Sequence, residues 1–513
     1  MSIPVIDLFA GPGGLGEGFS SLTVDGAKRA FKIELSVEMD EHAHRTLELR
    51  AFYREFPHRE APCEYYDYLA GGISREALFE KNPDAATAAS REAWLAELGS
   101  DAIRDSEVDE RIHKALGNEK KWVLIGGPPC QAYSLVGRSR VIGREGREKY
   151  EADPRHKLYR HYLRILAVHR PPVFVMENVK GLLSAKVKLE RTFDKILADL
   201  RNPVAAMSSE PSEVERGELE YRLIPLSAGR GDISNGSEPE DFVLRAEDYG
   251  IPQARHRIII VGVRSDLAAE PDALKTTDRA NIEDVIGDLP RLRSGLSKEP
   301  DSAMAWFQAV HAGLGGEWFD KLAFPHDFRI ALMSWAEQIE DNFERGGPWK
   351  LGKVIPKRHQ DWYCDPKLAG VCNHETRGHI RADLHRYFFA AVFAKIYGRS
   401  PLLEDFPEEL LPKHENVAAA LKETKFNDRF RVQLAGRPST TVVSHISKDG
   451  HYFIHYDPAQ CRSLTVREAA RLQTFPDNYF FEGARTEQYR QVGNAVPPLL
   501  ARQIAARVAS FLA

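Results

Sequence analysis

Short apolar runs that alternate with helix-like stretches constrain the fold of this chain more than any other feature of its sequence. The first run ends at Asp7, and a glycine-rich turn and a helix-like stretch follow it. A second run, residues 31–40, ends in acidic residues at about the spacing at which a doubly wound sheet places its ribose-binding carboxylate. Further candidate strands are residues 122–127, 172–179 and 257–263. Because strands that alternate with helices form parallel sheets, we expect an α/β fold with a mostly parallel, Rossmann-like sheet.

Composition limits the class of protein. The chain has 513 residues, of which 43% are hydrophobic and 28% charged, as in a globular protein of roughly two or three domains. It has no apolar run of about 18 residues and no basic-then-apolar amino terminus, so we expect no membrane partner, no secretion and a cytoplasmic location. The net charge of −5 at pH 7 means that any nucleic acid must bind to local basic patches.

The regular alternation stops near residue 265, and this change divides the chain. We expect a first domain at residues 1–265, with a helical insertion at about 74–121. Residues 266–485 are irregular and are expected to form a smaller second domain. Residues 486–513 are expected to return to the first domain as a terminal segment.

Four local patterns predict elements after residue 265. Residues 381–397 have helical apolar spacing, and Gly398 marks the end of the helix. The segment 440–456 indicates a hairpin that turns at Asp449 and Gly450. Thr465 with Glu468 forms a capping box before a short helix. Leu500, Ile504 and Val508 form an apolar stripe on a terminal helix.

The glycines after the first strand indicate a ligand that approaches the backbone closely. Small residues in such a turn leave room for a ligand, and the helix behind them offers unpaired N–H groups. Phe9 at the strand tip can stack on a base, and Glu38 at the end of the second strand can accept from ribose hydroxyls. The turn lacks the GxxxxGK[ST] pattern, which argues against ATP hydrolysis. A nucleoside ligand is the interpretation we favour, and a tight structural turn is the alternative; the glycines are Gly11, Gly13, Gly14 and Gly16.

Cys130 is one of five scattered cysteines, whose odd number and wide spacing do not suggest a disulfide framework. It follows a candidate strand at its carboxyl end, where open α/β sheets bind their ligands. A free thiol is intrinsically nucleophilic and is easily activated by its surroundings. A buried structural cysteine is the alternative, but the two prolines before Cys130 fix an extended approach that presents its side chain. We therefore interpret Cys130 as a nucleophile.

Three charged residues accompany candidate strands. Glu177 follows four apolar residues, so it is either a capped strand end or a carboxyl that can hold a proton for a substrate. Arg255 and Arg257 alternate along an incipient strand and point to one face, where they can serve a substrate carbonyl or a phosphate. For these arginines a solvated strand end is the alternative.

Taken together, six motifs occur in an order that resembles the DNA (cytosine-5)-methyltransferases of prokaryotic type. They are DLFAGPGGL, GGPPCQ, ENVKGLL, QARHRI, LTVREAARLQTFPD and QVGNAVPP. The resemblance covers residues 5–265 and about 440–513. It implies a methyltransferase domain of Rossmann-like fold, and a target-recognition domain in the position of residues 266–485.

The resemblance also implies a mechanism. Cys130 would attack carbon 6 of a cytosine flipped out of double-stranded DNA, and carbon 5 would take a methyl group from S-adenosyl-L-methionine. Glu177 would bond ring nitrogen 3, and Arg257, with Arg255 beside it, would hold ring oxygen 2. The stretch from Arg138 to Arg164 has nine Lys or Arg against four Asp or Glu, so it is either a basic loop that closes over DNA or an ordinary solvated loop.

The same resemblance assigns residues to the cofactor. Phe9 would stack on adenine, Glu38 would hold the ribose, and Asp67 would meet the adenine amino group. Asn494 and Val496 would brace the site and touch the cofactor. The remaining cofactor-binding positions that it implies are Asp7, Ala10, Gly11, Gly13, Gly14, Leu15, Met39, Pro128 and Ala495.

Three functions stay open at this point. A DNA cytosine methyltransferase, with a cognate restriction or phage-defence complex as a possible partner, accounts for all six motifs. The long recognition region argues against a tRNA cytosine methyltransferase on the same fold. The set of catalytic side chains argues against a cofactor-binding DNA-recognition protein without catalysis. The candidate zinc ligands are Cys364, Cys372, His374 and His379. Their spacing fits no common zinc finger, so we expect no bound metal. His374 and Arg377 are alternatively expected to cap the following helix or to contact DNA.

Overall fold

The computed structural model describes most of the chain and divides it into two compact units. Unit 1 consists of Met1–Pro62, Glu76–Arg279 and Ala495–Ala513, and unit 2 of Cys63–Arg75 and Ala280–Asn494. The expected boundaries after residues 265 and 485 thus differ from those of the units. The described residues are 2–26, 28–128, 154–184, 186–187, 190–207, 220–227, 238–268, 272–314, 316–320, 324–412 and 427–512.

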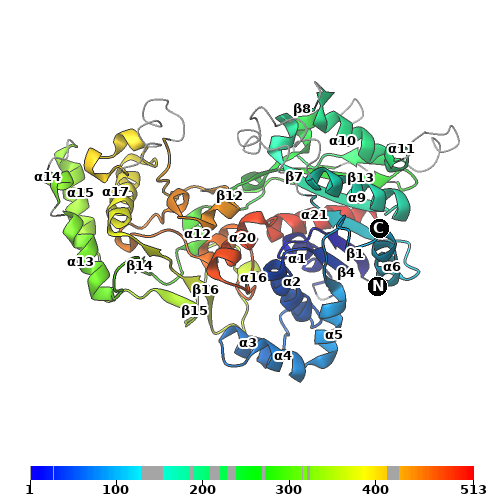
Figure 1. The fold of residues 1–513 in the computed structure, drawn as a ribbon, viewed down its shortest axis with the longest axis horizontal. Helices are drawn as coiled ribbons and strands as arrows, with labels where there is room; N and C mark the ends of the chain where they lie inside the picture. Colours follow the sequence, from blue (N-terminus) through cyan, green and yellow to red (C-terminus); the bar gives the residue numbers. More distant parts are fainter. Residues whose placement is uncertain are drawn as a thin grey trace. The chain divides into compact units, whose positions relative to one another are not determined.

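Unit 1 is built on one sheet, which contains the strands labelled β1, β4, β7 and β13 in Figure 1. Its strand order is β10-β13-β7-β6-β1-β4-β5, with β11 paired to β13. The strands from β7 to β5 run parallel, and β13 lies antiparallel to β7. The predicted α/β fold with a mostly parallel sheet is confirmed. The strands are β1 Ile3–Leu8, β4 Phe31–Glu38, β5 Ala93–Leu95, β6 Val123–Gly126, β7 Val173–Val179, β10 Tyr221–Ile224, β11 Val243–Arg245 and β13 His256–Arg264.

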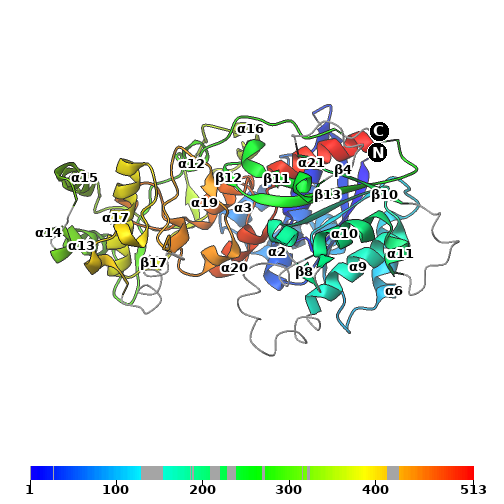
Figure 2. The same ribbon diagram turned by 90° about the horizontal axis from the view of Figure 1, so that it is seen from above.

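Helices cover both faces of this sheet, because neighbouring strand residues point to opposite sides. One apolar cluster joins Val5 and Val175 of the strands to α1 Gly14–Ser20 and α21 Pro498–Phe511. The second cluster packs the alternate strand residues against helices on the other face; these helices are α6 Asp105–Leu116, α9 Pro154–His169 and α10 Thr192–Arg201. Figure 2 shows the strands between α21 and the pair α9 and α10. The predicted stripe of Leu500, Ile504 and Val508 is buried in the first of these clusters.

The segment 74–121 is more than the helical insertion that we expected. It holds α4 Arg75–Lys81, α5 Pro83–Glu92 and α6, but Ala93–Leu95 forms the edge strand β5, which pairs with β4. Trp94 is buried in the core of the sheet, and Arg111 lies over its ring at 4.1 Å. A strand of three residues is too short to show alternation in the sequence, which is why the helical prediction was wrong there.

Unit 2 packs around one long helix. The helix α17 consists of Arg381–Tyr397, and its buried side chains lie in an apolar core that is rich in aromatic residues. It ends, as predicted, at Gly398, which adopts φ 65°. Unit 2 also contains short two-stranded sheets, β14 Gly295–Leu296 with β17 Gly378–His379 and β15 Gly346–Leu351 with β16 Gly370–Glu375. The other α-helices in the described part of unit 2 are α3 Cys63–Leu69, α12 Ile282–Ile286, α13 Ala303–Leu314, α14 Glu317–Asp320, α15 His326–Ala336, α16 Gln360–Tyr363, α19 Val466–Leu472 and α20 Arg485–Asn494.

The predicted hairpin at 440–456 is wrong. Residues 444–447 and 451–453 form 3₁₀ turns, although Gly450 has the positive φ of 77° that a turn requires. Ile454 donates its N–H to Arg431 O at 2.9 Å, and Leu464 donates to Phe453 O at 2.9 Å. The backbone of this segment is therefore bonded to distant residues, which local turn signals do not reveal.

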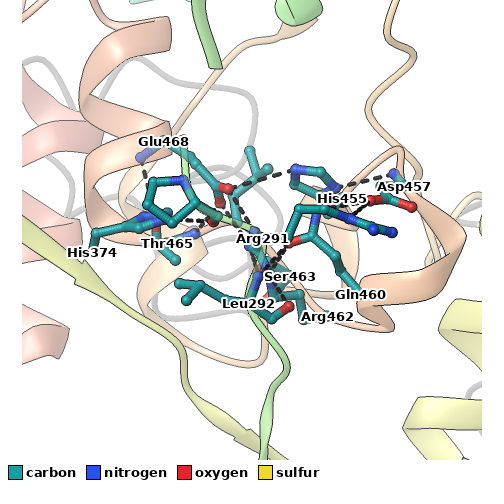
Figure 3. A network of polar contacts seen from close by, with 12 residues as sticks. Arg291, Leu292, His374, His455, Asp457, Gln460, Arg462, Ser463, Thr465 and Glu468 are labelled. Atoms are coloured by element: carbon teal, nitrogen blue, oxygen red, sulfur yellow. Dashed lines mark hydrogen bonds and ion pairs between the residues drawn. The ribbon is translucent and has the colours of Figure 1, made fainter. Parts of the chain in front are cut away.

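A buried polar network surrounds the start of α19 (Figure 3). The capping box is confirmed, because Thr465 Oγ1 accepts from Glu468 N and Thr465 N donates to Glu468 Oε2 at 2.7 Å. Arg462 donates two hydrogen bonds of 2.7 Å to the same carboxylate, and both side chains are only 1% exposed. His374 lies 2.9 Å from Thr465 Oγ1, and His455 lies 3.5 Å from Glu468 Oε1. We call these residues the α19 network.

Acid is expected to destabilise unit 2 through the two histidines of the α19 network. Burial lowers the pKa of His374 and of His455 to about 4, so both are neutral in the folded protein at pH 7. The unfolded chain, with a histidine pKa of about 6.5, binds more protons between pH 6.5 and 4, so stability falls as pH falls through this window. We expect each histidine to remove about 2 kcal/mol of unfolding free energy between pH 7 and pH 5.

Urea unfolding at pH 7, 6 and 5, followed by tryptophan fluorescence, measures this loss. The variant His374→Asn is the control, because an amide at this position does not titrate. A wild-type unfolding midpoint that stays constant from pH 7 to pH 5 contradicts the prediction.

Candidate active site

Glu177 and Arg257 meet at one end of two paired strands of unit 1. Glu177 lies on β7 opposite Ile259 of β13, and Arg257 lies two residues before Ile259, so both side chains are on the same face. Arg257 Nε is 3.0 Å from Glu177 Oε1, and the two side chains are 13% and 16% exposed. Burial lowers the pKa of Arg257, and the Glu177 carboxylate opposes this effect. The two predicted residues therefore form a largely desolvated ion pair.

Arg255 lies beside this pair. It follows β12, Gln253–Ala254, its carbonyl accepts from Ala246 N at 3.0 Å, and its side chain is 1% exposed. Burial lowers its pKa well below the ordinary value, and the nearby Arg257 lowers it further while Glu177 opposes both effects. The structure thus brings together the three charged residues that the sequence singled out. A carboxyl and two guanidinium groups at one place can bond the ring nitrogen and the carbonyl oxygen of a planar base.

The backbone that leads toward Cys130 passes directly along Glu177. A Cβ added to Gly127 would lie 2.8 Å from Glu177 Oε2 and 2.9 Å from its carbonyl oxygen, so only glycine allows this approach. Pro128 is the last described residue before the gap, and Cys130 lies outside the described residues, as does most of the basic stretch from Arg138. The role of Cys130 stays a prediction.

The glycine turn is held by Glu38. Gly11 N donates to Glu38 Oε2 at 2.8 Å, and Asp40 N donates to Glu38 Oε1 at 2.7 Å. Burial raises the pKa of Glu38, which these two backbone bonds oppose. Gly11 has φ 58°, and a Cβ added there would meet nothing within 4 Å, so the turn is open on that side. A half-buried Phe9, an open glycine and a fixed carboxylate acceptor fit a nucleoside.

Residues from the end of the chain complete this turn. A Cβ on Gly14 would lie 2.4 Å from Val496 O and 3.3 Å from Ala495 Cβ, so the two segments touch although they are far apart in the sequence. Ala10 N donates to Val37 O at 3.0 Å, while Met39 is 57% exposed. The structure therefore places Val496 and Ala495 against the turn, and their role toward a cofactor, like that of Met39, stays a prediction.

Two other implied residues lie in the interior. Leu15 packs in the apolar cluster beneath α21. Asp7 is 1% exposed, and burial raises the pKa of its carboxyl to about 8, while Arg54 opposes the shift. A Cβ on Gly16 would lie 3.1 Å from Asp7 Oδ2. Asp7 thus supports the strand end beneath α1 and does not face the open side of the turn.

Comparison with known proteins identifies the family. The sequence model of the family described as C-5 cytosine-specific DNA methylase matches residues 101–203, 238–307 and 399–510. The chain belongs to the C-5 cytosine-specific DNA methylases. It is 33% identical to a type II methyltransferase of Bacillus paralicheniformis, over 98% of either chain. It is also 30% identical to a DNA (cytosine-5-)-methyltransferase of Aeropyrum pernix, over 76% of this chain and 81% of the other.

Two predicted cofactor residues of this methylase belong to unit 2. Asp67 lies on α3, whose neighbouring tyrosines are bonded within unit 2: Tyr65 OH donates to Asn478 O at 2.9 Å and Tyr66 OH to Asp365 Oδ2 at 2.7 Å. Asn494 is the last residue of α20. The glycine turn belongs to unit 1, so the description of unit 1 does not include Asp67 or Asn494. Their roles in binding the cofactor stay predictions.

Sequence reasoning missed one residue beside the charged cluster of the methylase. Asn178 follows Glu177 on β7 and is 4% exposed, and its amide bonds the carbonyl of Pro128. The sequence did contain a signal for Asn178, because it is a polar residue within an apolar strand. The interpretation considered only the acidic residue beside it, Glu177.

Two of the four candidate metal ligands, His374 and His379, make other contacts in the described part of the methylase. His374 belongs to the α19 network, and His379 Nε2 lies 3.2 Å from Ser463 Oγ. Arg377 donates to Ile446 O at 2.6 Å, so it holds a backbone segment of unit 2. No group of three His, Cys, Asp or Glu side chains in the described residues could hold a metal ion. Nor does any described helix have the length and apolarity needed to cross a membrane.

Proposed function

We propose that this methylase transfers a methyl group to carbon 5 of a flipped-out cytosine in double-stranded DNA, through a covalent adduct with Cys130. The observation that carries the proposal is the buried cluster of Glu177, Arg257 and Arg255, beside the backbone that leads to Cys130. The match to the family supports cytosine as the modified base and carbon 5 as the methylated atom. Extrusion of the cytosine is required because its carbon 6 cannot be reached inside a stacked duplex.

The chain's own residues would share the chemistry. The Cys130 thiolate forms a bond to carbon 6, and the displaced π electrons make carbon 5 nucleophilic. Glu177 bonds ring nitrogen 3 and takes up the charge that develops on the ring, while Arg257 and Arg255 hold ring oxygen 2. After carbon 5 is methylated, it loses its proton, and the electrons of that C–H bond expel the Cys130 thiolate. The enzyme returns to its starting state without an added oxidant or reductant.

S-adenosyl-L-methionine fits the glycine turn and would supply the electrophilic methyl group. Phe9 would contact the adenine, and Glu38 would accept from the ribose hydroxyls with the lone pairs that Gly11 N and Asp40 N leave free. Val496 and Ala495 would close the turn from the side of Gly14. We further infer that the protein acts in the cytoplasm beside a cognate restriction or defence complex, since named relatives are type II methyltransferases.

Glu177→Gln is expected to lower the methylation rate at saturating substrates by about 100-fold or more, because the amide cannot hold the ring proton. The matched control is Glu247→Gln. Glu247 is also buried, lies 2.7 Å from His256 Nε2 next to Arg257 in the sequence, and has no place in the proposed chemistry. Methyl transfer to duplex DNA by the purified proteins measures both variants. Equal losses in the two variants would contradict the role of Glu177.

Bisulfite sequencing of DNA from cells that express the protein, beside cells that express Glu177→Gln, tests the function as a whole. We expect methylated cytosines in one recurring short context in the first cells and far fewer in the second. Methylation of tRNA with unmodified DNA would establish the alternative substrate. Unmodified DNA and RNA, together with a failure of the purified protein to bind S-adenosyl-L-methionine, would overturn the proposal.

A further inference from the structure

The charge of unit 2 changes sign between two consecutive segments of its sequence. Residues 326–344, which include α15, hold five Asp or Glu and one Arg. Residues 345–360, which follow directly and include most of β15, hold five Lys or Arg and no Asp or Glu. A polyanion is repelled by the first segment and attracted by the second. A nucleic acid bound to this part of unit 2 therefore contacts residues 345–360.

Within the basic segment, four alternate residues have exposed side chains. We call them the 351–357 stripe; they are Leu351, Lys353, Ile355 and Lys357. Leu351 is 75% exposed and Ile355 is 50% exposed, and the Lys357 side chain is 67% exposed. Between them, Val354 is half-buried and Pro356 is buried. The stripe thus presents apolar and cationic side chains in alternation on one solvent-exposed side.

The backbone of the stripe is fixed near both ends. Gly352 N donates to Ala369 O at 3.1 Å, and Arg358 N donates to Asp284 O at 3.2 Å. A segment that is held in this way loses less conformational entropy on binding than a free loop does. The stripe is therefore preorganised to bind a ligand.

The sheet leaves Leu351 uncovered. Leu351 pairs with Gly370 of β16, the strand beside β15 in Figure 1, and glycine offers no side chain to pack against it. A Cβ added to Gly370 would lie 2.6 Å from the ring of Trp349, so a larger residue does not fit there. Leu351 is the most exposed large apolar residue of the described chain. A large apolar side chain within an exposed patch marks an interaction surface.

The two lysines of the stripe can each bind a phosphate. Lys353 has no hydrogen-bond or ion-pair partner among the described residues. Lys357 Nζ lies 3.3 Å from Glu283 Oε1, but the Glu283 side chain is 49% exposed. Such exposed ion pairs contribute little to stability, so exchanging the carboxylate for a phosphate costs little.

We propose that the 351–357 stripe is a surface by which unit 2 binds duplex DNA. Lys353 and Lys357 bind backbone phosphates, and Leu351 and Ile355 contact apolar edges of bases, such as thymine methyl groups, in the groove. DNA is the polyanion that fits, because the chain belongs to a family of DNA methylases. The inference rests on the proposed function and names residues of unit 2 that contact its substrate.

Lys353→Gln tests the phosphate contact. The dissociation constant of the full-length protein for a short, fluorescently labelled DNA duplex of mixed sequence is measured at several salt concentrations. Loss of one phosphate contact is expected to reduce the slope of log affinity against log salt by about one, and to weaken binding about fivefold at about 0.15 M salt. Lys395→Gln is the matched control, because Lys395 is also exposed but its Nζ lies 5.6 Å from the ring of Trp335 on α15.

Leu351→Ser tests the groove contact. Because this change removes apolar contact and no charge, we expect binding to weaken about fivefold while the slope of log affinity against log salt stays the same. Ile330→Ser is the matched control, since Ile330 is 51% exposed on the acidic α15. All four side chains are on the surface, so the variants should unfold at the same urea concentration as the wild type.

The outcomes separate this inference from the proposed function. Wild-type affinity and salt slope in Lys353→Gln, or an equal change in Lys395→Gln, would overturn the phosphate contact. Equal affinities of Leu351→Ser and Ile330→Ser would overturn the groove contact. Failure of the wild-type protein to bind any DNA duplex would overturn the proposed function on which both contacts rest.

Discussion

Cys130→Ser is expected to abolish DNA methylation while leaving the affinity for S-adenosyl-L-methionine unchanged within about twofold. A serine hydroxyl is not ionised near neutral pH, so the bond to carbon 6 does not form and carbon 5 never becomes nucleophilic. The glycine turn with Glu38 does not depend on this side chain. Transfer of a labelled methyl group to duplex DNA measures the reaction, and equilibrium binding of S-adenosyl-L-methionine measures the second quantity.

The control for this substitution is Cys63→Ser, because Cys63 is exposed and its loss should leave the methylation rate unchanged. Residual turnover by Cys130→Ser above the level of the Glu177→Gln variant would refute the covalent mechanism. Loss of S-adenosyl-L-methionine binding in the same variant would show that the site had been disturbed as a whole.

The second large effect concerns stability. Glu468→Gln is expected to lower the free energy of unfolding of unit 2 by about 3–5 kcal/mol, because it leaves the buried Arg462 guanidinium without its counter-charge. The same carboxylate also accepts from Thr465 N, so the amino-terminal cap of α19 weakens as well. Urea unfolding followed by tryptophan fluorescence measures the change.

Glu299→Gln provides the comparison. Glu299 accepts hydrogen bonds of 2.6–3.0 Å from Arg381, but this pair is solvent-exposed, with 53% of the arginine side chain accessible. Exposed ion pairs contribute little to stability, so the unfolding midpoint of this variant should stay close to that of the wild type. If Glu468→Gln lowers the free energy of unfolding no more than Glu299→Gln does, burial does not determine how much the α19 network contributes to stability.

Local patterns in the sequence were sufficient for the main elements of the fold. Apolar runs located the strands β1, β4, β6, β7 and β13, Gly398 located the end of α17, and Thr465 with Glu468 located the start of α19. Each of these signals lies within a few residues of the element that it predicts. The strands β5, β10 and β11 were missed because three or four residues carry too little periodicity.

The candidate site could be predicted in its residue types but not in its contacts. Glu177, Arg255 and Arg257 were named from the sequence, whereas the 3.0 Å pair depends on the antiparallel register of β13 with β7. The bond of Asn178 to Pro128 joins positions 50 residues apart, and no local signal encodes it. The hairpin failed for the same reason, since Ile454 bonds Arg431 and not a neighbouring strand.

The path of the chain through unit 1 also orders its synthesis. Helix α21 covers the same face of the sheet as α1, yet it is formed by Pro498–Phe511, which are synthesised after every residue of unit 2. Until those residues are made, that face of the sheet lacks Leu500, Ile504 and Val508, which pack in the same apolar cluster as Val5 and Val123. Unit 2 has by then been translated in full. The nascent chain therefore passes through an interval in which unit 2 has been synthesised in full while unit 1 still lacks α21, and apolar surface left exposed in that interval favours aggregation.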